Sequence, residues 1–139
     1  MLTHLRINII VGGDKLIILD LKTSKPIYEQ IVEQMKLHVM QKNLKPGDAI
    51  PSVRKLALDL KITPGTVSKA YQELERDGII ETIRGKGTFI ASEIVVKEDE
   101  SKLAKIKKDL NSVVLELKVM GYSEAEIEQL VKAAFNQMR

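Results

Sequence analysis

Between residues 51 and 76, apolar residues recur at i, i+3, i+4 and i+7 in two successive stretches. This spacing places one apolar stripe on each of two short helices and leaves polar residues on the opposite faces. The stripe of the first helix comprises Val53, Leu56, Ala57 and Leu60. The stripe of the second comprises Val67, Ala70, Tyr71 and Leu74. The pattern therefore predicts two amphipathic helices joined by a tight turn.

The residues at the helix ends support these boundaries. Ser52 stands where an N-cap belongs, because its hydroxyl can accept a hydrogen bond from an unpaired N–H of the first turn. Ile62 closes the turn, Thr63 can cap the second helix, and Pro64 suits its first position. The N–H that proline lacks would have no intrahelical partner there.

A small hairpin is predicted directly after the second helix. Asp77-Gly78 ends that helix, because glycine tolerates the left-handed conformation common at helix ends. The expected first strand is defined by the alternation of Ile79, Glu81 and Ile83. Residues 88–90, Thr-Phe-Ile, return as the second strand.

The tip of that hairpin combines glycine with positive charge. Gly85 and Gly87 permit a tight turn from which Arg84 and Lys86 project. Two helices followed by such a hairpin indicate a helix-turn-helix with a wing, whose backbone at Gly85 can approach a minor groove.

The outer side of the second helix carries small, hydrogen-bonding and basic residues, which suit a helix that enters a major groove and touches base edges. They are Gly65, Thr66, Ser68, Lys69 and Gln72. Thr63 and Thr66 can also contact phosphate, because hydroxyls and helix N-terminal amides suit an anion.

An earlier helix is predicted from about Pro26 to Asn43, with Ser24 or Lys25 before it. Its buried stripe is expected to comprise Ile27, Ile31, Met35 and Val39 or Met40. We interpret this helix as scaffold, and His38 beside the stripe as a partly buried structural residue rather than a metal ligand. Residues 44–48 form a loop with Pro-Gly turn chemistry.

Two interpretations of residues 1–15 are open. Gly12-Gly13 must be encoded by two GGN codons, which could form a purine-rich ribosome-binding sequence shortly before a Leu16 codon used as an alternative start. The natural chain would then begin at that codon as methionine, and peptides from the preceding segment in protein made from its own locus would contradict this. Alternatively, Leu5 to Val11 form an extra strand with Leu16 to Leu19, turning at Gly12-Gly13.

After Ala91 the composition shifts to a charged connector, residues 97–101, and then to two amphipathic helices. The first has a heptad-like seam of Leu103, Ile106, Leu110, Val113, Leu117 and Met120. Gly121-Tyr122 breaks this helix, and Ser123 with Glu126 forms a capping box for the next. The apolar face of the last helix comprises Ile127, Leu130, Val131, Ala134, Phe135 and Met138.

These two stripes exceed what a small winged domain can cover. The simplest solution is an antiparallel helical hairpin that pairs with its copy from a second chain. Two recognition helices related by a two-fold axis would read a pseudo-palindrome with half-sites about 34–36 Å apart or a multiple of that. The alternative is a monomer whose tail folds over its own core, because stripe patterns do not identify their partner.

The ordered set of residues from about Pro26 to Ala91 resembles the GntR family of bacterial transcription regulators. The matching signature is Pro51-Ser52-x-Arg54-x-Leu56-Ala57, Thr66-Val67 with Ala70-Tyr71-x-x-Leu74, Asp77-Gly78, and Gly85-x-Gly87-Thr88-Phe89. The resemblance implies that Arg54 contacts DNA. Many relatives have a second arginine where this sequence has Pro64-Gly65, so base reading is expected of Ser68 and Lys69, with Gln72 as a further candidate.

The short tail narrows this resemblance. GntR regulators usually carry a large C-terminal domain that binds an effector or resembles an aminotransferase, for which the chain has no room. The two short helices resemble the YtrA-like branch, whose members are small dimers and often lie beside genes for ABC transporters. The resemblance implies repression of the protein's own operon and leaves the operator and any effector unidentified.

The composition argues against a disulfide-bonded protein, a thiolate metal site and a membrane protein. The chain has 139 residues, a net charge of +3 and no cysteine, so neither a disulfide nor a thiolate metal site is expected. No apolar run is long enough to span a bilayer, and we expect a cytoplasmic protein without a membrane partner. The charge suits an anionic partner mildly.

We expect no enzyme, catalytic residue, cofactor or metal. His4 and His38 lie far from any carboxylate cluster, and Gly85-Lys86-Gly87 lacks the spacing of a phosphate-binding loop. The alternative to a DNA-binding regulator is a winged-helix module that binds protein. Basic residues on both the second helix and the wing oppose it.

The expected fold is mainly α with a small β-hairpin: an N-terminal winged helix-turn-helix plus a C-terminal helical dimerisation hairpin. The expected domains are a possible extension at 1–15, the DNA-binding domain at 16–92 and the dimerisation region at 93–139. The expected DNA contacts are Ser52, Arg54, Thr63, Gly65, Thr66, Ser68, Lys69, Arg84, Gly85 and Lys86. The expected dimerisation residues are Leu103, Ile106, Leu110, Val113, Leu117, Ile127, Leu130, Val131 and Phe135.

Overall fold

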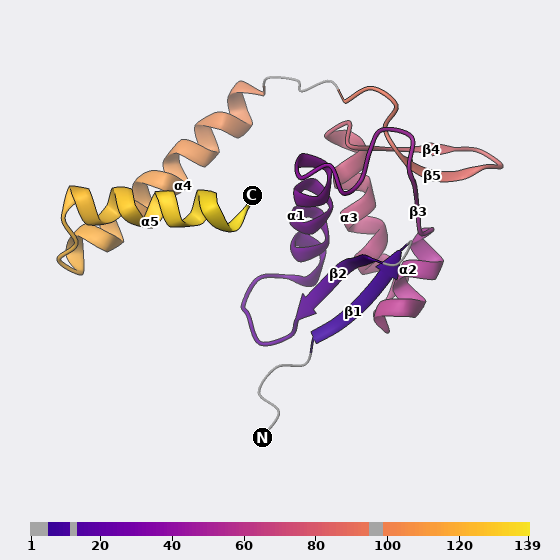
Figure 1. Cartoon of the computed structure of the whole chain (residues 1–139), viewed down its shortest axis with the longest axis horizontal. Helices are drawn as coiled ribbons and strands as arrows, with labels where there is room; N and C mark the ends of the chain where they lie inside the picture. Colours follow the sequence, from indigo (N-terminus) through magenta and orange to yellow (C-terminus); the bar gives the residue numbers. More distant parts are fainter. Residues whose placement is uncertain (1–5, 12–13, 95–98) are drawn as a thin grey trace. The chain divides into compact units, whose positions relative to one another are not determined.

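The computed structural model describes residues 6–11, 14–94 and 99–139 (Figure 1). The chain divides into two compact units, Met1–Val96 and Lys97–Arg139. The elements of the first unit are β1 (Arg6–Val11), β2 (Asp14–Asp20), α1 (Ile27–Met40), β3 (Ala49–Ile50), α2 (Val53–Leu60), α3 (Pro64–Arg76), β4 (Ile80–Ile83) and β5 (Gly87–Ile90). Those of the second are α4 (Glu100–Val119) and α5 (Glu124–Gln137).

The predicted pair of helices is confirmed as α2 and α3. The side chain of Ser52 accepts a hydrogen bond from the Lys55 N–H at 3.1 Å, which caps α2. Lys61 ends α2 in the left-handed conformation with φ 56°, and α3 begins at Pro64. The buried residues of both helices are those of the predicted stripes: Leu56, Ala57, Leu60, Val67, Ala70, Tyr71 and Leu74. Local spacing was therefore sufficient to orient both helices.

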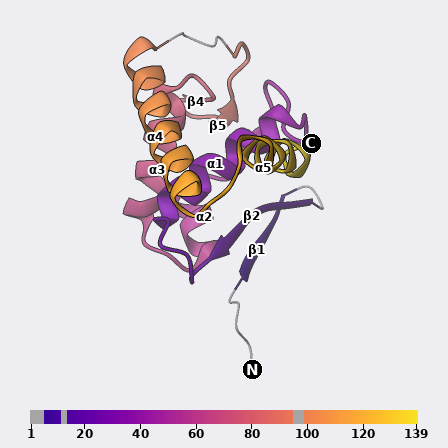
Figure 2. The same cartoon turned by 90° about the vertical axis from the view of Figure 1, so that its left-hand side faces the viewer.

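Helices α1, α2 and α3 enclose the core of the first unit (Figure 2). Ile31 and Met35 of α1 are completely buried, together with Leu56, Leu60 and Leu74. The predicted helix from Pro26 to Asn43 was too long, because Pro26 is the N-cap and the chain leaves the helix through a left-handed Lys42, φ 61°. Of its two alternative stripe residues, Val39 packs on the core and Met40 is exposed.

The wing belongs to a three-stranded antiparallel sheet with the order β3-β5-β4. Ala49 pairs with Phe89, and Ile80 pairs with Ile90. The predicted alternation from Ile79 was one residue out of phase, because the strand begins at Ile80, which is buried, whereas Ile83 is 40% exposed. Two adjacent isoleucines allow either phase, and packing against α3 selects Ile80.

The N-terminal strands form a separate two-stranded sheet. β1 pairs antiparallel with β2, with Ile9 opposite Ile17 and Ile7 opposite Leu19. The predicted extra strand is thus confirmed, while its turn at Gly12-Gly13 lies outside the described residues. The start of the natural chain stays a prediction.

Polar side chains of α1 bind the edge of β2 that does not pair with β1. Gln34 exchanges two hydrogen bonds with the backbone of Ile18, at 2.7 and 2.6 Å, and Gln30 exchanges two with Asp20, both at 2.9 Å. His38 Nε2 lies 2.6 Å from the carbonyl oxygen of Leu16. Because a carbonyl only accepts, this ring nitrogen carries the proton. His38 is half-buried, and its Nε2 is engaged in this structural contact.

Tyr71 connects α3 to the segment that precedes α2. Its hydroxyl donates to the carbonyl oxygen of Pro51 at 2.6 Å, and its side chain is 5% exposed. Burial raises the pKa of Tyr71 above its usual value of 10.0. The neutral phenol thus holds the start of α2 against the middle of α3.

We expect Tyr71→Phe to lower the free energy of unfolding by about 1–2 kcal/mol at neutral pH, because the Pro51 carbonyl loses its donor. The unfolded chain releases the tyrosine proton near pH 10, whereas the folded protein retains it, so the stabilisation is complete below about pH 10 and is lost above it. Urea unfolding of both proteins between pH 7 and 11 should show the difference shrinking at the alkaline end. A difference that grows with pH would contradict this role.

In the second unit, α4 ends at Val119, and Gly121 shortly after it has φ 92°. The predicted capping box starts α5: Glu126 N–H donates to Ser123 Oγ at 3.2 Å, and Ser123 N–H donates to Glu126 Oε1 at 3.1 Å. These bonds lower the pKa of Glu126. Of the apolar side chains described in this unit, only Val114, Leu117 and Ile127 are partly covered. All others are exposed, so α4 and α5 pack on each other only near their connection.

No helix among the described residues is long and apolar enough to cross a membrane.

Candidate nucleic-acid interface

Arg54 lies in the first turn of α2 and is exposed. Within the described residues it has no hydrogen-bond or ion-pair partner. Its neighbour Lys55 differs, because its Nζ lies 3.3 Å from Asp59 Oδ2. The predicted residue Ser52 lies just before Arg54 and uses its Oγ to cap the helix.

The N-terminus of α3 is exposed. Thr63 occupies the N-cap position, but the predicted cap is wrong in its chemistry, because the side chain makes no hydrogen bond to the helix backbone. Its Oγ1 lies 2.9 Å from Thr66 Oγ1 instead. Gly65 follows with open space at the position of a Cβ, since no atom lies within 4 Å of it apart from its chain neighbours and the adjacent backbone of its own helix. Two paired hydroxyls and a residue without a side chain therefore form the surface at this end of α3.

One turn further along α3, Gln72 Nε2 lies 3.4 Å from Ser68 Oγ, which brings these two predicted base-contacting residues together. Lys69 contacts α1 instead of these two residues: its Nζ lies 4.0 Å from the ring centroid of Tyr28. Ser68 is half-buried, whereas Lys69 and Gln72 are exposed. The outer face of α3 thus carries an amide–hydroxyl pair beside a cation held over a ring.

The wing projects from the helices, and its tip and α2 both lie to the right of α3 in Figure 1. The Lys86 N–H donates to the Ile83 carbonyl at 2.9 Å, which closes the turn. Gly85 has φ 80°, a conformation that favours glycine. Arg84 and Lys86 are exposed at the tip and have no ion-pair or hydrogen-bond partner among the described side chains.

Three of the described lysines in the first unit form ion pairs with acidic side chains. The paired lysines are Lys25 with Glu33, Lys36 with Asp77 and Lys55 with Asp59. Among the described residues, Lys22, Lys42, Lys45, Lys61 and Arg76 also form no ion pair. We use the name unpaired basic set for the three such residues at the start of α2 and on the wing, Arg54, Arg84 and Lys86. The unpaired basic set comes from α2 and from the wing, whose tip lies on the same side of α3 as α2 does in Figure 1.

The predicted dimerisation residues lie in the second unit. Leu103, Ile106, Leu110 and Val113 of α4 are 42–54% exposed, and Phe135 of α5 is 66% exposed. Leu130 and Val131 are exposed to a similar degree, while Leu117 and Ile127 are partly covered. The structure thus leaves most of both apolar faces without cover among the described residues of this unit.

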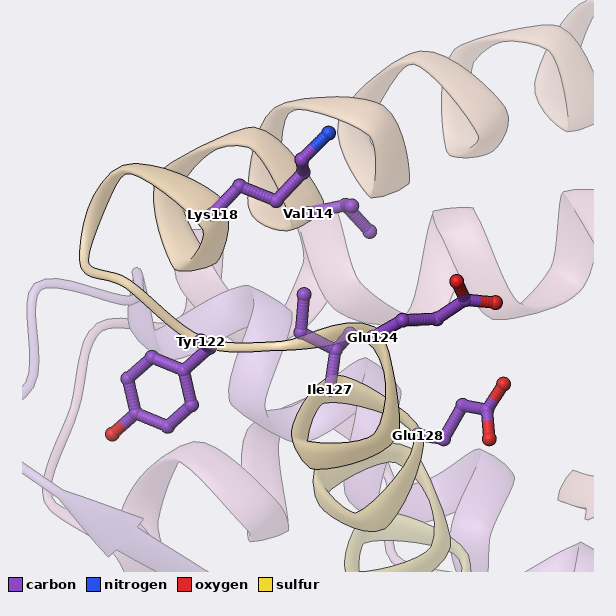
Figure 3. A pocket seen from close by; sticks show the side chains of 6 residues that line it. All are labelled: Val114, Lys118, Tyr122, Glu124, Ile127 and Glu128. Carbon is purple, nitrogen blue, oxygen red and sulfur yellow. The ribbon is translucent and has the colours of Figure 1, made fainter.

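A cavity of about 300 Å³ lies at the connection between α4 and α5. Val114 and Ile127 face it from the two helices, and Glu124 and Glu128 extend together on one side (Figure 3). Lys118 and Tyr122 complete its lining. Among the described residues, no group of acidic or histidine side chains is placed to hold a metal ion.

Two features of this surface had no signal in the sequence. Tyr28 was not predicted to be near Lys69, because the residues belong to different helices and their contact depends on how α1 packs on α3. The ion pair between Lys36 and Asp77, at 2.7 Å, connects the same two helices and was likewise not predicted.

A helix pair with an exposed second helix, followed by a hairpin with a basic tip, defines a winged helix-turn-helix protein. Residues 27–90 match the family described as bacterial regulatory proteins, gntR family. The chain is 43% identical over 114 residues to the HTH-type transcriptional repressor YtrA of Bacillus subtilis, which covers 82% of this chain and 88% of that protein. It is 41% identical over 112 residues to the regulator YhcF of the same organism, covering 80% and 91%.

Solved structures agree. A transcriptional antiterminator from Listeria monocytogenes is 39% identical, with a TM-score of 0.79 over 86% of this chain and 90% of that one. A GntR family transcriptional regulator from the same organism is 30% identical, with a TM-score of 0.56 over 81% and 98%. The chain belongs to the GntR family, and within it to the YtrA-like branch. The relatives named here are transcriptional regulators rather than enzymes.

Proposed function

We propose that the protein is a sequence-specific DNA-binding repressor that acts as a homodimer on a pseudo-palindromic operator. The observation that carries the proposal is the unpaired basic set, because its cations lie at the start of α2 and at the tip of the wing, the two elements that flank α3 in the sequence. Cations without acidic partners are available to neutralise phosphates and release their counterions. α2 and the wing accompany α3 in a winged helix-turn-helix, whose second helix enters the major groove.

In this proposal α3 reads bases and its N-terminus contacts the backbone. Ser68 and Lys69 face base edges, with Gln72 held beside Ser68. Thr63 and Thr66 contact phosphate through their hydroxyls, and Gly65 lets the backbone come close because nothing stands at its Cβ position. Ser52 holds the helix start from which Arg54 reaches a base or phosphate. The wing places Arg84, Gly85 and Lys86 at the adjacent minor groove.

The second unit supplies the dimer contact. Most of its apolar residues on α4 and α5 are about half exposed or more, and a stripe of this kind is stable in water when a second amphipathic surface covers it. The cavity beside Val114 and Ile127 can accept an apolar side chain of a second copy. We therefore assign DNA binding to residues 16–92 and dimerisation to residues 93–139, with residues 1–15 as an extension.

The regulatory outcome rests on the relatives. The Bacillus subtilis relative is named a repressor, and we propose the same sign of regulation here. The resemblance to the YtrA-like branch extends the proposal to an operon for an ABC transporter, and such a regulator acts in the cytoplasm, where bacterial DNA lies.

The proposal is tested by selecting binding sites from a pool of random DNA duplexes and measuring affinity for the enriched site at several salt concentrations. We expect two inverted half-sites with centres about 34–36 Å apart or a multiple of that. Lys86→Ala should weaken binding to the enriched and a scrambled duplex alike and reduce the slope of log K against log salt by about one. Lys105→Ala, which removes an exposed charge from α4, is the control and should leave the slope unchanged.

Equal binding of the enriched and scrambled duplexes would contradict sequence-specific recognition. Binding that does not depend on salt would favour the protein-interaction module instead. Duplex RNA of the enriched sequence should compete weakly, because its major groove is too narrow for a helix.

A further inference from the structure

The contact between Lys69 and Tyr28 brings a residue of the scaffold helix α1 to the outer face of α3. Lys69 Nζ lies 4.0 Å from the centroid of the Tyr28 ring, well within the range of a cation–π interaction. On α3, Lys69 lies opposite the buried stripe that contains Ala70 and Tyr71. The ammonium is thus held on the surface that the proposed function assigns to DNA.

The ring itself has little freedom. Tyr28 is half-buried in the first turn of α1 and packs against the core. Its hydroxyl donates to Glu29 Oε1 at 3.2 Å. Partial burial, and next the carboxylates of Glu29 and Glu73, raise the pKa of Tyr28, so the ring is a neutral phenol with acidic groups around it. Both the ring and these carboxylates favour a cation at this place.

A held lysine differs from a mobile one in what it adds to recognition. An unrestrained lysine must lose the freedom of its long side chain when it makes one defined contact, and this loss weakens the specific complex. A lysine already placed over a ring has lost part of that freedom before DNA arrives. Its three N–H donors cannot all point into one ring face, so donors remain for an oxygen or nitrogen acceptor of the DNA.

We infer that Tyr28 is a positioning residue for DNA recognition, which holds the Lys69 ammonium in place for one defined contact in the operator complex. The inference rests on the proposed function. It assigns Lys69 a share in sequence discrimination through Tyr28, whereas a mobile lysine would add mainly general attraction to DNA.

A double-mutant cycle on the full chain tests this, with fluorescence anisotropy of the enriched duplex as the readout. Tyr28→Leu should weaken operator binding about two- to fivefold, as expected for an exposed cation–π pair, and leave the salt slope unchanged because no charge is removed. Tyr28→Phe keeps the ring and should bind like wild type. Lys69→Gln should weaken binding to the enriched duplex more than to the scrambled duplex, because the contact it removes contributes to specificity.

The decisive measurement is the combination. In the Lys69→Gln background, Tyr28→Leu should cause no further loss of affinity, because the side chain on which Tyr28 acts is gone. An equal loss in both backgrounds would show that Tyr28 supports the fold alone and would overturn the inference, as would wild-type affinity of Tyr28→Leu. A different result would contradict the proposed function: the wild-type protein would then bind the enriched and the scrambled duplex equally. This outcome is measured on the wild-type protein alone, so it is distinguishable from a failure of the inference about Tyr28.

Discussion

Leu110→Glu is expected to convert the protein from a dimer to a monomer and to weaken binding to a two-half-site operator by about 10²–10⁴-fold, the usual gain from linking two binding events. Leu110 lies in the centre of the α4 seam and is 54% exposed, so the substitution adds a charge to the surface that a second copy would cover. Burying that charge without a partner is unfavourable. Analytical ultracentrifugation gives the oligomeric state, and anisotropy with one or two half-sites gives the affinity.

Leu115→Glu is the matched control. Leu115 is 63% exposed on the same helix, but it lies five residues after Leu110, about 140° around the helix and away from the seam. This variant should remain a dimer and bind the operator like wild type. A dimer that survives Leu110→Glu, or a wild-type protein that sediments as a monomer at micromolar concentration, would place the contact elsewhere.

The second large effect is expected from Arg54→Ala, which should reduce specific operator binding by about 1–3 kcal/mol, roughly 5- to 150-fold, and relax the preference at one base pair. Arg54 is exposed on α2, and among the described residues nothing holds its guanidinium, so its donors are available to DNA. Competition between the enriched duplex and single-base variants measures both changes.

Arg139→Ala removes an equal charge from an exposed residue at the end of the chain and should have no such effect. The melting temperature should be unchanged in both variants, since neither side chain is buried. If Arg54→Ala binds the enriched duplex like wild type at moderate salt, the DNA-binding surface has been assigned to the wrong residues.

The sequence was most informative where a contact depends on neighbours along one helix. Leu56 and Leu60, or Val67 and Leu74, are buried because their spacing puts them on one side, and no knowledge of the partner helix was needed. The capping box at Ser123 was equally predictable, because both of its hydrogen bonds join residues three positions apart.

Contacts between elements could not be predicted in the same way. Ile79 and Ile80 both suit a strand, and only the packing of β4 selects the buried one. Lys69 was predicted from the sequence only as a base-contacting residue, yet it lies over Tyr28 because α1 packs on α3. The surroundings of Lys69 therefore depend on how two helices far apart in the sequence pack together, which the pattern along one helix does not predict.

The side chains that α1 extends to β2 have a geometric consequence. Gln30, Gln34 and His38 are spaced by four residues, or about 6.0 Å along a helix, and they meet Asp20, Ile18 and Leu16, which are spaced by two, or about 6.4–6.8 Å along a strand. The spacing of the contacting residues along the helix is thus nearly equal to their spacing along the strand. The difference accumulates to only about 1 Å over the three contacts, which flexible side chains can absorb.

The side chains of α1 therefore fix which residues of β2 face the helix. Sliding the strand by one residue would turn its other edge toward the helix and bring Ile17 and Leu19, both fully buried, out of the core. The first turn of the same helix contains Tyr28. The register of β2 against α1 and the position of Lys69 are therefore both set by one helix. A one-residue deletion in α1 between Tyr28 and Gln30 would change the position of Tyr28 relative to the side chains that bind β2. It would therefore disturb both the contacts with β2 and the contact with Lys69.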